Sequence, residues 1–300
     1  MNNIFHIKSI SEVHKFLGLG KPKHPLVMVI PNNCIDLDAA PTSYITDLYT
    51  ITLKNGMSGS MQYGRSSYDF EEGTMLFIAP GQVIAPVDAV ESKDISGWTL
   101  LFHPDLIRRT SLGQKINQYS FFSYQVNEAL HLSETEKQTV TELIQKVIRE
   151  TEQNIDQHTG RLISGSIELL LDYCTRFYDR QFYTRSDLSS DTISEFEQLL
   201  RQYFQNEQQL EHGLPTVAHC GKQLGLSPKY LSDLLKKETG KTAKEHIQLF
   251  IVELAKNRLL SSSQTVSKIA YDLGFEYPPH FSKLFKKLTA YSPTQFRDLH

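Results

Sequence analysis

One motif occurs twice in the last third of the chain. The segments LGLSPKYLSDLLKKETG, at residues 224–240, and LGFEYPPHFSKLFKKLTA, at residues 273–290, align with an offset of 49 residues before a turn and 50 after it. Each copy has the pattern of a helix, a turn that contains glycine, and a second helix with one apolar and one basic face. That pattern is typical of a helix-turn-helix that reads DNA. Two copies predict one domain with two DNA-reading helices.

The local signals in the first copy agree with this prediction. Gly225 supplies the backbone freedom that a tight turn needs, and Ser227 followed by Pro228 is a strong helix start. Gly240 is suited to cap the end of the second helix. A helix over this segment turns five polar residues outward: Lys229, Ser232, Asp233, Lys236 and Lys237.

A longer helix is predicted between the two copies. Thr242 and Glu245 form the pattern of a capping box, and the apolar periodicity continues to about Ser261. A helix of about 17 residues spans about 25 Å. This length is compatible with two recognition helices on one face of a duplex, which must lie roughly 34 Å apart. The connecting helix can therefore hold two readers at a fixed separation.

The second copy turns a similar set outward: His280, Ser282, Lys283, Lys286 and Lys287. Residues near the start of a recognition helix reach base edges, and later lysines reach phosphates. The alternative is that the lysine pairs only solvate a helix face. Because the pair recurs at the same place in both copies, phosphate contacts are favoured.

The charge distribution points to the same part of the chain. The net charge is −3, but residues 214–300 carry 13 Lys and Arg against 7 Asp and Glu, whereas the preceding residues carry 18 against 27. A basic C-terminal portion indicates a polyanionic partner for that portion. A chance excess of surface lysines would give the same numbers, so charge alone does not decide.

The first half of the chain has the pattern of short strands followed by helices. Four apolar, β-rich segments predict a small barrel or sandwich, and they lie at residues 25–31, 48–56, 73–81 and 97–103. Further along, Ser133 and Glu136 predict a capping box. The apolar spacing after it predicts two helices joined by a polar segment.

The sequence contains no assembled catalytic or metal-binding set. Cys34, Cys174 and Cys220 are few and far apart, which disfavours a disulfide framework and a zinc site. His103 stands alone, and no HxH, GxxxxGK, GxSxG or HExxH pattern occurs. We expect no enzyme and no cofactor, with a cupin enzyme joined to a DNA-binding domain as the alternative. Without a signal peptide or an apolar span, we expect a cytoplasmic protein with no membrane partner.

The C-terminal region resembles the DNA-binding domain of the AraC family of bacterial transcription regulators. SPKYLSDLLKKETGK, IAYDLGFEYPPHFSKLFKKLTAYSPTQFR and the helix between them carry the resemblance. It implies an activator or repressor of transcription that binds double-stranded DNA in consecutive major grooves, with RNA polymerase as a further partner. The positions that read bases in the family fall on Lys229, Ser232, Asp233, Pro279, His280, Ser282 and Lys283.

Two residues depart from the family pattern. Asp233 stands where a basic residue is common, and it could accept from a cytosine amino group or pair with a lysine and read nothing. Ala290 stands where the family usually has the capping glycine. If that backbone is left-handed, alanine costs about 1 kcal/mol.

The upstream region resembles, less specifically, the cupin-like sensor barrel and dimerisation hairpin of the family, most clearly in YDFEEGTMLFIAPGQV and GWTLLFHPDLI. The expected fold class is α+β, with an N-terminal cupin-like β-barrel, a helical hairpin and an all-α DNA-binding domain. The expected boundaries are 1–112 for an arm and the barrel, 113–183 for the hairpin, 184–190 for a linker and 191–300 for the DNA-binding domain.

The resemblance also implies a small-molecule effector in the barrel and a homodimer formed through the hairpin. Aromatic residues in the strands are the candidate effector pocket: Tyr49, Tyr63, Phe77, Trp98 and Phe102. Two alternatives stay open. The barrel could serve only to dimerise a constitutive regulator, and aromatic residues in strands are more often core than pocket.

Overall fold

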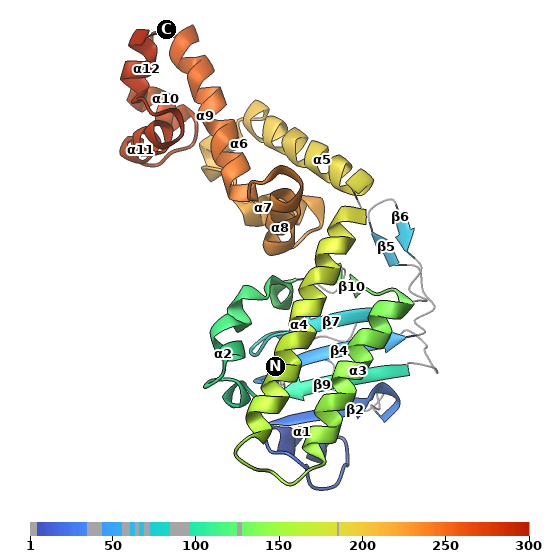
Figure 1. Cartoon of the computed structure of the whole chain (residues 1–300). Helices are drawn as coiled ribbons and strands as arrows, with labels where there is room; N and C mark the ends of the chain where they lie inside the picture. The colour runs from blue at the N-terminus through green and yellow to red at the C-terminus, as the bar shows by residue number, and fades with distance from the viewer. Residues whose placement is uncertain are drawn as a thin grey trace. The chain divides into compact units, whose positions relative to one another are not determined.

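The computed structural model describes residues 5–34, 44–55, 61–63, 66–68, 73–84, 96–124, 128–184 and 186–299 (Figure 1). Of residues 61–63, 66–68, 83–84, 183–184 and 186–190 it describes the backbone alone. The chain divides into two compact units, Met1–Gln181 and Phe182–His300.

The first unit contains strands and helices. Its strands are β1 (Phe5–Ile7), β2 (Val27–Pro31), β3 (Tyr44–Thr46), β4 (Tyr49–Asn55), β5 (Met61–Tyr63), β6 (Ser66–Tyr68), β7 (Thr74–Ile78), β8 (Val83–Ile84), β9 (Ser96–Phe102) and β10 (Leu130–His131). Its helices are α1 (Ile10–Phe16), η1 (Asn32–Cys34), η2 (Pro104–Leu106), α2 (Ser111–Lys115), η3 (Ile116–Gln118), η4 (Ser120–Ser123), α3 (Glu134–Thr151) and α4 (Thr159–Thr184).

The four predicted strands are neighbours in one antiparallel sheet of order β10-β7-β4-β9-β2. In its register, Ile51 on β4 lies opposite Phe77 on β7 and Leu100 on β9. The other described strands form a three-stranded sheet, β1-β3-β8, and a two-stranded ribbon, β5-β6. The strand predictions are therefore confirmed.

A closed barrel is not formed by the described strands. The five-stranded sheet has two edges, β10 and β2, and neither pairs with the three-stranded sheet or the ribbon. Closure depends on strand tilt and stagger, which strand-forming sequence patterns do not encode. The mixed α/β class of this unit is confirmed, whereas the cupin-like barrel is not.

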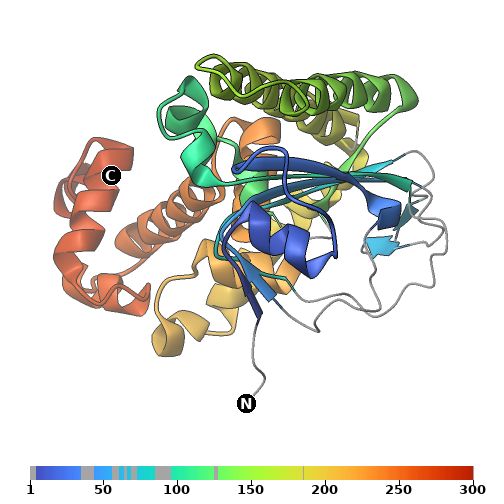
Figure 2. The same cartoon turned by 90° about the horizontal axis from the view of Figure 1, so that it is seen from below.

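Helices cover both faces of the sheet, with α3 and α4 on one side and α1 on the other (Figures 1 and 2). Because side chains alternate along a strand, one set of apolar residues faces α3 and α4. Met75 belongs to this set, and its Sδ lies 3.9 Å from the Sγ of Cys174 on α4. On the other face, Met28, Ile30 and Leu101 pack into a cluster with Ile10 and Val13 of α1.

The predicted hairpin of α3 and α4 is confirmed. Ser133 Oγ accepts a hydrogen bond from Glu136 N at 3.4 Å, and Ser133 N donates to Glu136 Oε2 at 2.9 Å. Arg180 on α4 holds the start of α3, because its Nη2 lies 2.7 Å from Glu136 Oε2 and from the carbonyl of His131. The buried residues of the two helices include Val140, Leu143, Ile144, Val147, Ile163, Ile167, Leu170, Leu171, Cys174 and Phe177.

The second unit consists of helices. They are α5 (Ser186–Gln205), α6 (Gln208–His212), α7 (Val217–Leu224), α8 (Pro228–Thr239), α9 (Ala243–Ser261), α10 (Val266–Asp272), α11 (Pro278–Thr289) and α12 (Pro293–Leu299).

The structure differs from the predicted segmentation in two places. Residues 186–190, expected in a linker, lie in α5, and the boundary between the compact units falls at residues 181 and 182. A polar segment can extend an established helix because each added residue gains a hydrogen bond without a new nucleation cost. In addition, β10 lies inside the segment expected to form only the hairpin and pairs with β7.

Cys174 and Cys220 are buried free thiols, as expected, and Cys34 is a free thiol at the surface. Burial raises the pKa of the Cys220 thiol to about 11. Within the described part of the chain, no helix has both the length and the apolar composition to cross a membrane.

Candidate nucleic-acid interface

The first helix-turn-helix consists of α7 and α8. Thr216 caps α7, because its side chain accepts a hydrogen bond from His219 N at 3.0 Å. Gly225 ends α7 in the left-handed region, with φ of 68°. Ser227 Oγ accepts from Tyr230 N at 3.2 Å and caps α8, whose first residue is a proline. The predicted start and stop signals of this unit are confirmed.

The second helix-turn-helix consists of α10 and α11. Thr265 caps α10 by accepting from Lys268 N at 3.2 Å, and Gly274 in the turn has φ of 90°. Tyr277 precedes Pro278 at the start of α11 and makes no side-chain capping hydrogen bond. The two recognition helices therefore start differently: a serine caps α8, whereas α11 has no side-chain cap.

The repeat continues beyond the two recognition helices. Thr239 Oγ1 donates to Leu235 O at 2.7 Å, and Thr289 Oγ1 donates to Phe285 O at 2.8 Å. Next in each copy is a left-handed residue, and then a new helix starts at a capping box. Thr242 and Glu245 form that box for α9, and Ser292 and Gln295 exchange the equivalent hydrogen bonds for α12. Helices α9 and α12 are thus equivalent members of the two repeats.

Ala290 occupies the left-handed position of the second copy. Its φ is 68°, against 76° for Gly240 in the first copy, and each residue donates its N–H to the carbonyl four residues earlier at 2.9 Å. A side chain with a Cβ is disfavoured in this region. The expected backbone conformation at Ala290 is confirmed.

Helix α9 supports both helix-turn-helix motifs. Helices α8, α10, α11 and α12 all contact it, with α8 toward one end and α10 to α12 toward the other (Figure 1). Ile247, Ile251 and Ala255 are among its buried residues, and Phe281 and Phe285 of α11 are fully buried. Because both recognition helices pack on one continuous helix, α9 sets their separation.

The predicted DNA-contacting residues lie on the outer faces of α8 and α11. The exposed ones are Lys229, Lys236, Lys237, Pro279, His280, Lys283, Lys286 and Lys287, and the half-buried ones are Ser232, Asp233 and Ser282. No described residue forms an ion pair with Lys236, Lys286 or Lys287. These ammonium groups are therefore available to an external anion.

Asp233 forms an ion pair with Lys229, the residue one turn earlier on α8. The distance from Lys229 Nζ to Asp233 Oδ1 is 2.9 Å. Of the two interpretations of Asp233, the structure therefore shows pairing with a lysine. Lys229 is exposed and Asp233 is half-buried, so the pair lies at the surface, where an ion pair contributes little to stability. DNA can therefore compete for either partner.

Tyr277 is a surface residue that the sequence pattern did not single out. Its side chain is 56% exposed, and its ring lies 5.7 Å from the ring of His280 in an edge-on arrangement. The sequence signal that could have identified Tyr277 is its position directly before Pro278, where the first copy has the capping residue Ser227.

The four candidate effector residues whose side chains are described lie on one face of the large sheet. Tyr49 stacks on Phe102 at 5.0 Å, and Phe77 lies 4.4 Å from Phe121 and 6.1 Å from Tyr178 on α4. Phe102 is fully buried.

Trp98, the fourth of these residues, is 7% exposed. Together these rings fill the layer between the sheet and its covering segments, which favours the core interpretation over an effector pocket. The side chain of Tyr63, the fifth candidate, lies outside the described residues.

His103 has a structural contact. Its Nδ1 accepts a hydrogen bond from Asp105 N at 3.2 Å and so caps η2. Among the described residues, no three His, Cys, Asp or Glu side chains are grouped as ligands for a metal ion.

One match to a known protein family falls within the second compact unit. Residues 220–298 match the sequence model of a helix-turn-helix domain family. An HTH-type transcriptional regulator in the cgkA 5′ region of Pseudoalteromonas carrageenovora is 36% identical over 95 residues, which cover 32% of this chain and 54% of that protein. The HTH-type transcriptional regulator YijO of Escherichia coli strain K12 is 27% identical over 192 residues, which cover 64% of each protein.

A solved structure also matches part of the chain. The C-terminal domain of the two-component response regulator yesN from Fusobacterium nucleatum has 26% sequence identity and a TM-score of 0.32, and the match covers 36% of this chain and 98% of that one. The chain spans less than two thirds of the length of both curated relatives described above.

Proposed function

Because residues 220–298 match a helix-turn-helix domain family, we propose that the chain is a transcription regulator of the AraC type that binds DNA with two recognition helices. The observation that carries the proposal is the repeat itself. Two capped helix-turn-helix units on one supporting helix present lysines at equivalent outer positions. Recognition helices that enter successive major grooves require this arrangement.

We assign different roles to residues along each recognition helix. In the first helix-turn-helix, base edges would be read by Lys229, Ser232 and Asp233. In the second helix-turn-helix, they would be read by Pro279, His280, Ser282 and Lys283. These residues lie in the first two turns of α8 and α11, the part of a recognition helix that reaches bases. The later lysines Lys236, Lys237, Lys286 and Lys287 would contact phosphates.

The Lys229–Asp233 ion pair makes one of these roles conditional. While the pair is intact, neither side chain offers its full hydrogen-bonding capacity to a base. Contact with a guanine would draw Lys229 away from Asp233, and contact with a cytosine amino group would draw Asp233 away from Lys229. DNA binding would therefore replace the Lys229–Asp233 ion pair with a contact between one of these residues and a base.

The lysine assignment predicts a change in salt dependence. Replacing Lys236 and Lys286 by Ala should weaken binding of the full chain to every duplex, and should reduce the slope of log K against log salt by about 1.8, because two phosphate contacts are lost. The measurement is fluorescence anisotropy over a salt series, on a duplex selected from a random DNA pool.

The matched control is Lys146→Ala, because Lys146 is an exposed lysine on α3 in the first unit. It changes the net charge in the same direction but should leave the slope unchanged. A slope that stays constant in the double variant, or falls equally in the control, would show that these lysines do not contact phosphates.

We further propose that the first unit pairs two copies of the chain. Leu162 and Leu169 on α4 are 50% and 44% exposed, and their spacing of seven residues places them on one face of the helix. Their exposed face is distinct from the buried stripe that packs within the unit. A homodimer would join two tandem readers, and RNA polymerase would be the further partner of the DNA-bound assembly.

Control by a small effector belongs to the same proposal. The described aromatic candidates fill the core on one face of the sheet, so the polar residues on the opposite face, beside the apolar cluster with α1, are the better place for a ligand. There Thr99 Oγ1 donates to Asn32 Oδ1 at 2.8 Å and lies 3.1 Å from Thr52 Oγ1, and burial lowers the pKa of Lys54. Gating requires an effector with different affinities for the two states of the protein. A metabolite that stabilises the full chain without changing its DNA affinity would instead favour a constitutive regulator.

A further inference from the structure

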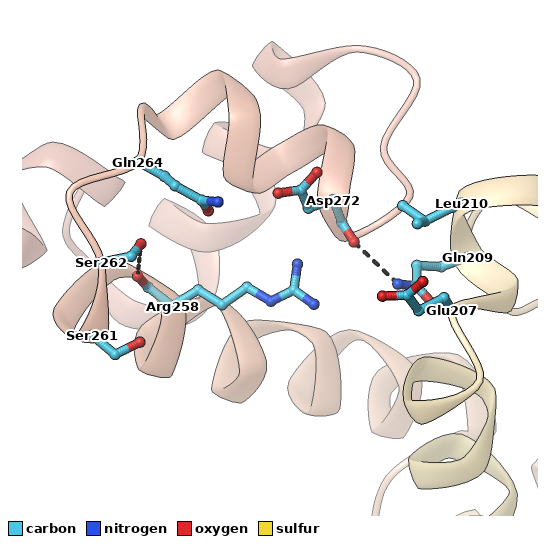
Figure 3. Close-up of a pocket in the computed structure, with 8 residues that line it drawn as sticks. All are labelled: Glu207, Gln209, Leu210, Arg258, Ser261, Ser262, Gln264 and Asp272. Carbon is cyan, nitrogen blue, oxygen red and sulfur yellow. Dashed lines mark hydrogen bonds between the residues drawn. The ribbon is translucent and has the colours of Figure 1, made fainter.

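A second kind of site lies inside the helical unit, at a cavity of about 410 Å³ (Figure 3). Its wall is formed by α6 and the residue before it, by the end of α9 and the loop after it, and by α10. A volume in this range is typical of small-molecule sites. The proposed DNA contacts use none of the residues that line it.

Gln209 contributes an unsatisfied polar atom to this wall. Its side chain is 2% exposed, and its Nε2 donates to the carbonyl of Asp272 at 3.2 Å. Its Oε1 is buried and has no hydrogen-bond partner among the described residues. Buried acceptors are normally paired, so an external donor would complete this group.

Arg258 contributes an unpaired positive charge. Figure 3 shows its side chain extending from α9 across the cavity toward Gln209 and Glu207. Its guanidinium forms no ion pair with any described residue, although Glu207 and Asp272 line the same cavity. A guanidinium remains charged at every physiological pH and prefers a carboxylate that it can bind through two hydrogen bonds.

The opposite side of the cavity carries negative charge. Glu207 has no ion-pair partner among the described residues. Its backbone lies in the left-handed region with φ of 53°, which is strained for a residue with a Cβ and is more common at functional sites than elsewhere. The Asp272 carboxylate also lines the cavity, and its Oδ1 lies 2.7 Å from Lys268 Nζ.

From these groups we infer that the cavity binds a free α-amino acid. The ligand carboxylate would pair with Arg258, while its ammonium group would donate to Gln209 Oε1 and face Glu207. Leu210, which is 57% exposed at the rim, supplies apolar surface for a ligand side chain. An anion alone would leave the acceptor and Glu207 unmatched, and a cation alone would leave Arg258 unmatched.

Binding at this place would act on the arrangement of the two readers. Helix α6 directly precedes the first helix-turn-helix, and α10 is the first helix of the second. The two already meet through Gln209 and the carbonyl of Asp272. An amino acid held by both sides would fix the second helix-turn-helix against α6, the helix that leads into the first helix-turn-helix. This consequence rests on the proposed DNA binding, whereas the ligand site does not.

The test uses the full chain without DNA, so its outcome is independent of the DNA-binding experiment. Isothermal titration calorimetry would be carried out with each standard L-amino acid. At least one should bind to the wild type, and its N-acetyl and amide derivatives should not, because each lacks one charge. Absence of binding by all of them, or equal binding of the derivatives, would overturn the inference.

Two variants and one control locate the site. Arg258→Gln should weaken binding by about tenfold or more, and Glu207→Gln, a change at an exposed side chain, should weaken it without affecting folding. Lys256→Gln is the control, since Lys256 lies on the same helix and pairs with Glu253 outside the cavity. If Arg258→Gln unfolds the chain, Glu207→Gln alone decides, and unchanged binding by that variant would contradict the assignment.

Discussion

At the scale of single residues, Ala290 shows a local cost that the rest of the domain tolerates. A left-handed residue is required there because the helix must end and the chain must enter the next capping box. The first copy satisfies this requirement with Gly240, and a Cβ built on that glycine meets no atom within 4 Å. The difference between the two copies at this position is therefore backbone strain and not packing.

This comparison predicts opposite effects for two substitutions. Ala290→Gly should stabilise the chain and Gly240→Ala should destabilise it, each by about 1 kcal/mol, because only the left-handed backbone distinguishes the residues. Urea unfolding of the full chain, monitored on the second unit, measures both. Changes of the same sign in the two variants would contradict the strain account.

His246 is a second residue with a measurable local effect. Thr239 Oγ1 donates to Leu235 O and lies 2.6 Å from His246 Nε2, so that ring nitrogen is the donor to the hydroxyl. Burial lowers the pKa of His246 below its usual value of 6.5, and the charge of Lys241 adds to this effect. The equivalent position in the second copy is Phe296, which packs on Phe285.

The lowered pKa of His246 fixes the sign of a pH effect. The unfolded chain binds the proton more readily than the folded one, so the free energy of unfolding should decrease as the pH falls below about 6.5. The loss should level off once the pH is below the pKa of the folded state. His246→Phe should make this part of the pH profile flatter in urea titrations. An unchanged profile would show that another group causes the dependence.

The sequence predicted residue roles only where local patterns determine them. Caps such as Ser133, Thr242 and Ser227 were predictable because a cap depends on a few adjacent residues. The partner of Asp233 could be narrowed to a lysine or a base, and the structure was needed to show Lys229. The exposed ring of Tyr277 was not predictable, because its exposure depends on how α11 packs.

At the scale of helices and strands, periodicity located the elements better than it located their ends. The stripes of α3, α4 and α9 were predicted because a buried helix face repeats every three to four residues. The start of α5 was not, because its first residues are polar and gain their helical structure from the helix that follows them. Whether the sheet closes into a barrel could also not be predicted from the sequence, because closure depends on how strands far apart in the chain meet.

The two helix-turn-helix units differ in how closely their helices approach the turn. A Cβ added to Gly221 in α7 would lie 2.6 Å from the carbonyl oxygen of Leu226. The second copy carries a buried alanine, Ala270, at the equivalent position. Its turn has one extra residue, which accompanies the extra methyl group.

This contact predicts that Gly221→Ala is destabilising despite the higher helix propensity of alanine. We expect a loss of roughly 1–3 kcal/mol from overpacking, with weaker DNA binding, measured by thermal unfolding and anisotropy. Gly165→Ala is the matched control, because a Cβ at Gly165 in α4 meets no atom within 4 Å. It should be neutral or stabilise by up to about 1 kcal/mol. Equal effects of the two substitutions would exclude the close approach as the cause.

At the scale of the whole molecule, a mixed α/β unit is joined to a helical unit whose residues 214–300 are basic. The helical unit holds two unequal readers on one helix, so one copy of the chain should recognise an asymmetric DNA sequence. The exposed leucines of α4 would pair two such copies. The amino acid site, if occupied, would adjust the two readers within each copy.

Hydroxyl-radical footprinting of the full chain on a selected duplex tests the central claim most directly. Two protected segments should appear for each copy, centred about 10 base pairs apart on one face of the duplex. Lys236→Ala with Lys237→Ala should remove protection of one segment, and Lys286→Ala with Lys287→Ala should remove protection of the other. A single protected segment, or the loss of both segments with either pair of substitutions, would contradict the two-reader account.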